Sequence, residues 1–203
     1  MEKLDFKKTL KHLYSGKIGE ESVVTVPPMQ FISIIGKGNP NSSQEYIDAI
    51  QALYPVAYTL KFMSKKNGAD YAVPPLEGLW WSDNMQDFAN GNKDDWQWKM
   101  MIMQPDFITE KMFIEACQSV ELKKAPVSLG KVKFEIYDEG RSAQVMYVGA
   151  YSNEGPTISK LHSFIETQGG SVRNTNKPHH EIYIGDPRKT ASDKLKTIIR
   201  QPF

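Results

Sequence analysis

Cysteine is nearly absent from this chain of 203 residues, which contains one, so no internal disulfide can form. An excess of charge of one sign is also absent: 25 basic and 24 acidic side chains leave a net charge of +1. This balance gives no electrostatic case for nucleic acid or an acidic membrane as a partner. No apolar run approaches the roughly 20 residues that would span a bilayer, and the N-terminal segment lacks the apolar core of a signal peptide. We therefore expect a soluble, cytoplasmic protein.

What the chain does contain is an internal duplication. An apolar strand at 29–36, a polar turn and a helix from about residue 43 are echoed by a strand at 143–149, a turn and a helix from about residue 156. Each block continues into a proline-led strand that carries one glutamate beside aromatic residues, and each ends in an apolar strand closed by Gln-Pro. Two strand–helix–strand–strand units predict a pseudo-twofold arrangement.

We predict one α+β domain over residues 1–203. Repeat one covers about 22–105, a connecting helix about 108–124, and repeat two about 130–203. The antiparallel sheets of the two pseudo-twofold-related β-α-β-β repeats would surround a central ligand groove, with helices on the outer face.

Local signals refine this prediction. Residues 3–14 have the spacing of a short amphipathic helix. Ser43 can cap the first long helix, and Pro55 is expected to kink or break it. A polar loop is expected between the two strands that follow this helix, and a hairpin is expected around Asp138-Glu-Gly140.

Four stretches give the chain a resemblance to a known family. They are Val26-Pro-Pro-Met-Gln-Phe31, Pro75-Leu-Glu-Gly-Leu-Trp-Trp81, Gln144-Val-Met-Tyr-Val-Gly149 and His180-Glu-Ile-Tyr-Ile-Gly-Asp-Pro-Arg188. In these motifs, and over nearly its whole length, the chain resembles the GyrI-like small-molecule-binding domains, in particular their stand-alone subgroup. The resemblance implies two repeated modules around a ligand groove.

The resemblance also implies function. The family includes ligand-sensing halves of multidrug regulators, an inhibitor of DNA gyrase, and stand-alone members similar to hydrolases that open the cyclopropane of DNA-alkylating natural products. In the sensors, a buried glutamate on a strand similar to His180-Glu-Ile-Tyr contacts cationic aromatic drugs, which points to Glu181 and, by internal symmetry, to Glu77. The regulators carry an additional helix-turn-helix region for which this chain has no room, so direct nucleic-acid binding is not expected.

Strand alternation decides which side chains would line the groove with the glutamates. The expected catalytic residues are Glu181, Glu77 and Tyr147. The expected ligand-binding residues are Trp81, one of Trp96 and Trp98, Tyr183, Leu79 and Met101. Aromatic rings give flat ligands a large contact area, and methionine sulfur adapts to varied shapes.

A carboxylate on such a wall is desolvated, so its pKa is expected to rise. Glu181 would then act as the general base that orients water toward the cyclopropane methylene, with Glu77 supporting it. Tyr147 or Tyr183 would stabilise the oxygen that becomes a phenolate. Release of ring strain and gain of aromaticity drive the reaction, so no metal or cofactor is expected.

Several residues and the function itself have alternative readings. His179 and His180 point to opposite faces of a strand, so a metal site is not expected there. Cys117 lies on an apolar helix stripe and is expected to be a buried, inert thiol. At the level of function, the alternatives to a hydrolase are a protein that sequesters or senses aromatic drugs without turnover, and a DNA gyrase inhibitor. The expected partner is a planar aromatic, cationic or electrophilic small molecule.

Overall fold

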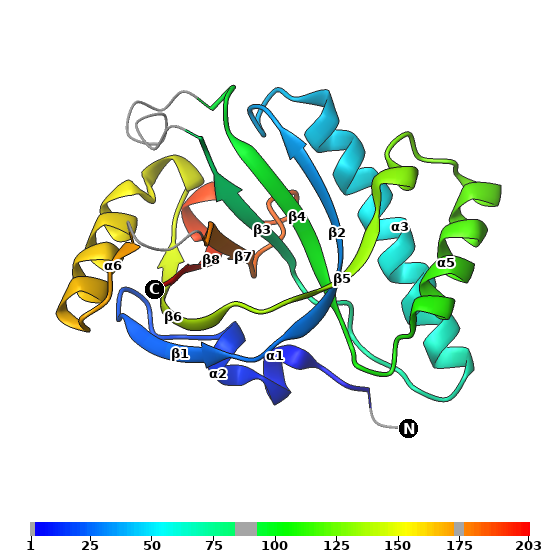
Figure 1. Cartoon of the computed structure of the whole chain (residues 1–203), viewed down its shortest axis with the longest axis horizontal. Coiled ribbons are helices and arrows are strands. Elements are labelled where there is room, and N and C mark those ends of the chain that lie inside the picture. Colours follow the sequence, from blue (N-terminus) through cyan, green and yellow to red (C-terminus); the bar gives the residue numbers. More distant parts are fainter. Residues whose placement is uncertain (1–2, 84–92, 173–176) are drawn as a thin grey trace. The chain divides into compact units, whose positions relative to one another are not determined.

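Figure 1 shows the computed structural model of the chain, which describes residues 3–83, 93–172 and 177–203. The chain folds into two compact units. The first unit consists of Met1–Asp5, Met29–Pro74 and Trp80–Tyr137, and the second of Phe6–Pro28, Pro75–Leu79 and Asp138–Phe203. Both units combine antiparallel strands with helices, which confirms the predicted α+β class. Among the described helices, none is both long enough and apolar enough to cross a membrane.

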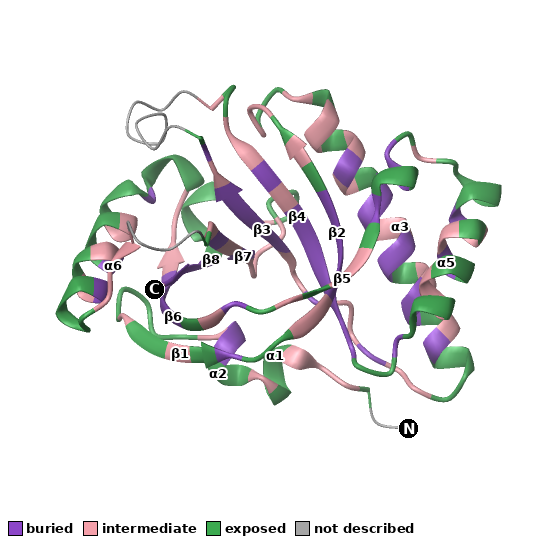
Figure 2. Ribbon diagram, in the orientation of Figure 1, coloured by how far each residue is buried: buried purple, intermediate pink, exposed green. Residues whose placement is uncertain are grey.

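The first unit is built on antiparallel strands. Strand β2 (Met29–Lys37) lies between β4 (Gln97–Gln104) and β5 (Lys133–Tyr137). In the strand order β3 (Leu76–Trp81) comes next to β4, and its last two residues belong to this unit. Figure 2 shows that β4 is buried along most of its length.

Two helices cover one face of this sheet. Helix α3 (Gln44–Lys66) contacts β2 and β4, and α5 (Glu110–Lys123) packs on α3. The hydroxyl of Ser43 accepts a hydrogen bond from the backbone N–H of Tyr46, and Thr109 caps α5 in the same way. These caps start both helices where the sequence predicts helices to start.

Helix α3 runs through Pro55 without a break, so the break that the proline could have caused does not occur. A proline inside a helix loses one backbone hydrogen bond and crowds the preceding turn. Buried residues continue on both sides of it, from Ala49 and Leu53 to Val56 and Leu60. This continuous packing against the sheet outweighs the local cost.

The second unit contains the other strands. Strand β6 (Gly140–Val148) pairs with β1 (Ser22–Val26) and β8 (Lys196–Pro202), and β8 also pairs with β7 (His179–Tyr183). Strand β3 comes next to β7 in the strand order, and its residues up to Leu79 belong to this unit. The helices of this unit are α1 (Phe6–Thr9), α2 (Lys11–Tyr14) and α6 (Gly155–Thr167). Short 3-10 turns occur in the chain at Leu129–Lys131, Tyr151–Asn153 and Ser192–Lys194.

The pairing in the second unit gives its sheet two different faces. Val145 lies opposite Ile199, which lies opposite Glu181, so these three side chains share a face. Helix α6 covers this face through Leu161 and Ile165, which join a cluster with Val145 and Ile199. On the other face, Gln144 lies opposite Arg200, which lies opposite His180.

Some local predictions differ from the structure. The predicted hairpin around Asp138-Glu-Gly140 is wrong, because β5 pairs with β2 whereas β6 pairs with β1 and β8. Residues 3–14 form two four-residue helices in place of one. The predicted polar loop falls mainly on residues 84–92, outside the described part of the chain.

The packing of Gly36 against Trp98 gives a first prediction. A Cβ atom at Gly36 would lie 2.2 Å from the Trp98 ring, which is fully buried. We expect Gly36→Ala to lower the free energy of unfolding by about 1–3 kcal/mol, because overpacking displaces a ring that has no free space. Urea denaturation measures this change.

The matched control is Gly130→Ala, because nothing lies within 4 Å of a Cβ atom built there. This variant should stay within about 0.5 kcal/mol of the parent protein. Equal stability of the two variants would contradict the tight packing of Trp98 against β2.

Candidate functional site

Six polar side chains meet on one face of the sheet in the second unit, and we call them the Glu77 network. They are Tyr14, Glu77, Glu139, Gln144, His180 and Arg200. Helix α2 supplies the tyrosine, the turn before β6 supplies Glu139, and strands β3, β6, β7 and β8 supply the others. All six are at most 3% exposed.

His180 joins the two carboxyl groups of this network. Its Nε2 lies 2.9 Å from Oε2 of Glu77, and its Nδ1 lies 2.9 Å from Oε1 of Glu139. The hydroxyl of Tyr14 donates to Oε1 of Glu77 at 2.8 Å. Nη1 of Arg200 donates to Oε2 of Glu139 at 3.0 Å. An imidazolium that donates from both ring nitrogens satisfies both carboxyl groups.

Burial and charge act in opposite directions on this network. Burial alone lowers the pKa of His180, but the charge and hydrogen bond of Glu139, followed by those of Glu77, raise it to about 9. Burial raises the pKa of Glu139, but His180 and Arg200 outweigh it and hold that pKa at about 2. Burial, reinforced by Glu77, raises the pKa of Tyr14 well above its usual value. At neutral pH the network therefore contains a charged His180, an ionised Glu139 and a neutral phenol.

A second polar group lies on the face that α6 covers, and we call it the Glu181 cluster. Its members are Glu181, His179, Tyr183, Tyr151, Tyr147 and Glu154. The hydroxyl of Tyr183 donates to Oε2 of Glu181 at 2.8 Å. Nε2 of His179 lies 3.3 Å from Oε1 of Glu181, close enough for an ion pair but not aligned for a hydrogen bond. The rings of Tyr151 and Tyr183 meet edge to face with centroids 5.6 Å apart.

The Glu181 cluster is partly open to solvent, with 15% of the Glu181 side chain and 13% of the His179 side chain exposed. Burial raises the pKa of Glu181, but His179, Tyr183 and a hydrogen bond with Glu154 lower it below its usual value. The expected rise in pKa is therefore wrong, because the interaction with His179 and the hydrogen bonds of Tyr183 and Glu154 favour the charged form by more than desolvation opposes it. Glu181 is an ionised carboxylate at neutral pH.

The structure does not bring the two predicted glutamates together. Glu77 contacts His180 of β7. Glu181 is the next residue of β7 and points to the opposite face, so the sheet separates the two carboxyl groups. Tyr147 lies on the Glu181 face and donates its hydroxyl to the carbonyl of Ala150 at 2.9 Å. Burial, with the nearby Glu154, raises the pKa of Tyr147.

The predicted aromatic and apolar residues differ in exposure. Leu79, Trp98 and Met101 are at most 2% exposed, whereas Trp81 and Trp96 are half-buried. The Trp98 ring meets Tyr46 of α3 edge to face at 5.3 Å. In this conformation the buried members contribute to the core, and Trp81 and Trp96 keep surface that a ligand could contact.

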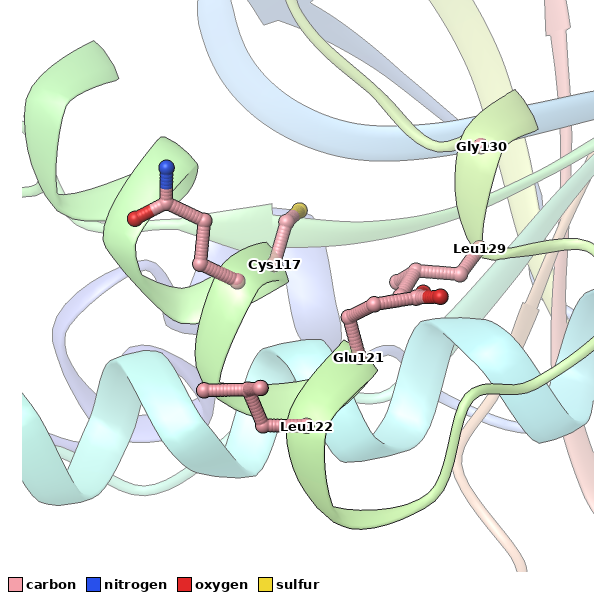
Figure 3. Close-up of a pocket in the computed structure, with 6 residues that line it drawn as sticks. Cys117, Glu121, Leu122, Leu129 and Gly130 are labelled. Carbon is pink, nitrogen blue, oxygen red and sulfur yellow. The ribbon is translucent and has the colours of Figure 1, made fainter.

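A shallow pocket lies elsewhere in the first unit, between α5 and the 3-10 turn at Leu129–Lys131 (Figure 3). Its volume is about 540 Å³, and its lining includes Cys117, Glu121 and Leu122. Burial raises the pKa of the Cys117 thiol, which disfavours a nucleophilic thiolate. The pocket contains no arrangement of acid, base and nucleophile among the residues that line it. Within the described ranges, no group of three or more His, Cys, Asp or Glu side chains could hold a metal ion.

Sequence reasoning missed Tyr14, Glu139, His180 and Arg200 as members of a buried network. The sequence did indicate that His180 points away from Glu181, because neighbouring residues of a strand such as β7 point to opposite faces of the sheet. The contacts of His180 with Glu77 and Glu139 span 103 and 41 residues of sequence, so no local pattern could reveal them.

Comparison with known proteins places this geometry in a family. Residues 20–203 match the GyrI-like small molecule binding domain. A hydrolase from Listeria innocua has a solved structure that is 40% identical, covers 98% of this chain and 99% of its own, and superposes with a TM-score of 0.83. An uncharacterized conserved protein from Listeria innocua is 39% identical over 98% of this chain and 99% of its own, with a TM-score of 0.88. The EcmrR C-terminal domain shares the fold at 14% identity, with a TM-score of 0.56 over 90% of this chain and 96% of its own. No curated protein matches the sequence.

The charge on His180 gives a second prediction. Because the folded-state pKa of about 9 lies above the usual value of 6.5, His180 contributes stability that is complete below about pH 6.5 and is lost as the pH rises to about 9. We expect the free energy of unfolding to fall across this window by up to about 1 kcal/mol per pH unit.

The measurement compares urea denaturation of the parent protein and His180→Gln between pH 6 and 9. The variant cannot lose a proton at this position, so its stability should depend less on pH. The same slope in both proteins would contradict a charged His180 between the two carboxyl groups.

Proposed function

The chain belongs to the GyrI-like small-molecule-binding domain family, and from this premise we propose that it binds planar aromatic ligands that are cationic or electrophilic. The observation that carries the proposal is the Glu181 cluster. It combines an ionised carboxylate, partial access to solvent and two tyrosine rings within one unit of the fold.

The chemistry of this cluster suits such ligands. The Glu181 carboxylate would supply a counter-charge in a partly desolvated position, where an ion pair is stronger than at the surface. The rings of Tyr151 and Tyr183 would supply aromatic contact beside it. Trp81 and Trp96 belong to the first unit, so we do not assign them to the cluster.

We further propose that the protein hydrolyses the cyclopropane of DNA-alkylating natural products, which would make it a detoxifying enzyme. Its 40% identity to a hydrolase over 98% of the chain supports a hydrolytic reaction. Glu181 is the proposed base, because an ionised carboxylate can accept the proton of an attacking water. Glu77 is not assigned a direct role in this step, because it lies on the other face of the sheet.

The proposed step balances without a further reactant. Glu181 takes a proton from water as the water oxygen bonds to the cyclopropane methylene carbon. The ring carbon–carbon bond breaks, and its electron pair makes the dienone aromatic. The former carbonyl oxygen becomes a phenolate, which then takes the proton. Tyr183 or Tyr147 would stabilise this oxygen, and each must first release its present acceptor, Glu181 or the carbonyl of Ala150.

Replacing Glu181 gives a third prediction. Glu181→Gln keeps the size of the side chain but removes the base, so kcat should fall by about 10²–10⁴-fold. The ring-opened product should still bind. The measurement incubates the protein with a cyclopropane-bearing dienone, first below one equivalent and then in excess, and follows the product by mass spectrometry.

Glu166→Gln is the matched control, because Glu166 is an exposed carboxylate of α6 in the same unit. This variant should turn over at the parent rate. Consumption of no more than one equivalent by the parent protein would refute hydrolysis and favour a protein that sequesters its ligand.

Tyr183 gives a fourth prediction. Its hydrogen bond contributes to the lowered pKa of Glu181. Tyr183→Phe removes this bond and should raise that pKa, so the acid limb of the pH–rate profile should move to higher pH. A limb that stays in place would indicate that Glu181 is not the base that titrates in the profile.

A further inference from the structure

The Glu77 network is covered by a segment that lies outside the matched family domain. The match begins at residue 20, whereas Tyr14 and Leu13 belong to α2. These are the two buried residues of α1 and α2. The hydroxyl of Tyr14 and the carbonyl of Leu13 contact charged groups that the domain itself supplies.

Three polar contacts join the end of this covering segment to the network. Nη2 of Arg200 donates to the carbonyl of Leu13 at 2.6 Å, and the Gln144 amide donates to the carbonyl of His12 at 2.7 Å. The hydroxyl of Tyr14 donates to Glu77. Lys7, Lys8 and Lys11 of the segment are exposed. Leu13 and Tyr14 are buried, and Phe6 and Leu10 are half-buried. Two short helices with this much apolar burial open at a lower cost than a core strand does.

Beneath Tyr14 lies a carboxyl group with one oxygen already fixed. His180 holds Oε2 of Glu77, and Oε1 accepts the tyrosine hydroxyl. If the segment moves away, Oε1 becomes available to a donor from a ligand. Fixing one oxygen in advance lowers the cost of ordering the acceptor when that ligand binds.

The charges of the network decide which donor fits. Two acidic side chains, Glu77 and Glu139, lie among two basic ones, His180 and Arg200. A cationic donor would add an unmatched charge to a region withdrawn from water, which is costly. A neutral hydroxyl adds none. The group that now fills the position, a phenol, is such a donor.

We propose that Glu77 and His180 form a ligand site for a phenolic hydroxyl, and that Tyr14 occupies this site as an internal ligand until a phenol displaces it. This site goes beyond the proposed function, because it lies on the opposite face of the sheet from Glu181. The ligand class is a small phenol whose ring takes the place of the Tyr14 ring. Only molecules in which the segment has moved away can bind the phenol. The apparent affinity is therefore the intrinsic affinity multiplied by the fraction of such molecules.

The experiment uses 4-methylphenol, which has the same ring and hydroxyl as the tyrosine side chain, and toluene, which lacks the hydroxyl. Calorimetry measures binding of each to the full chain, and trypsin cleavage after Lys11 reports release of the segment. We expect saturable binding of 4-methylphenol and faster cleavage in its presence, with neither effect for toluene. Equal binding of the two probes, or binding of 4-methylphenol without faster cleavage, would overturn the proposal, as would no binding.

Two variants separate this site from the Glu181 cluster. Tyr14→Phe removes the internal hydrogen bond, so the affinity for 4-methylphenol should rise on the order of tenfold. Glu181→Gln should leave that affinity unchanged. A loss of binding in Glu181→Gln would place the phenol in the Glu181 cluster, which overturns this proposal and leaves the proposed function standing. An unchanged affinity in Tyr14→Phe would show that Tyr14 does not compete with the ligand.

A third variant tests the acceptor itself. Glu77→Gln replaces one oxygen by an N–H donor of nearly the same size, so the affinity for 4-methylphenol should fall at least tenfold. Circular dichroism establishes that this variant is folded, and Tyr14→Phe keeps the test decisive if it is not. A folded Glu77→Gln protein that binds the phenol as well as the parent would exclude Glu77 as the acceptor.

Discussion

Mutual pairing of buried charge is the constraint on which the second unit depends. An isolated ion taken out of water costs several kcal/mol even after the surrounding structure relaxes. His180 therefore has to lie between Glu77 and Glu139, and Arg200 has to reach Glu139. These side chains come from β3, the turn before β6, β7 and β8. Pairing these buried charges with one another determines how segments that are far apart in the sequence meet on one face of the sheet.

The same constraint positions the proposed catalytic carboxylate. Adjacent residues of a strand point to opposite faces, so holding His180 in the network directs His179 and Glu181 to the face that α6 covers. There Tyr183, two residues further along the strand, is close enough to donate to Glu181. The ionised state of Glu181 thus depends on strand geometry that the opposite face of the sheet determines.

Local signals in the sequence predicted the elements, and long-range pairing limited the prediction of the site. The cap at Ser43 and the alternation along β7 are local, and both are observed. The turn at Asp138-Glu-Gly140 is also local, but the partners of the strands on each side are not, and the predicted hairpin was wrong for that reason. Internal symmetry suggested Glu77 and Glu181 as equivalent residues that share a site. The residue of β7 that Glu77 contacts is instead His180, which directly precedes Glu181. In a strand, a slip of one residue moves a side chain to the other face.

The two proposed sites differ in the ligand charge that each would accept. Around Glu77, acidic and basic groups already balance, so a neutral donor enters at a lower electrostatic cost than a cation. Around Glu181, hydrogen bonds hold a carboxylate in its ionised form beside tyrosine rings, an arrangement that favours a cation. The backbone of the sheet lies between them. If both proposals hold, a compact aromatic ligand that bears both a cationic group and a phenol would engage one face at a time.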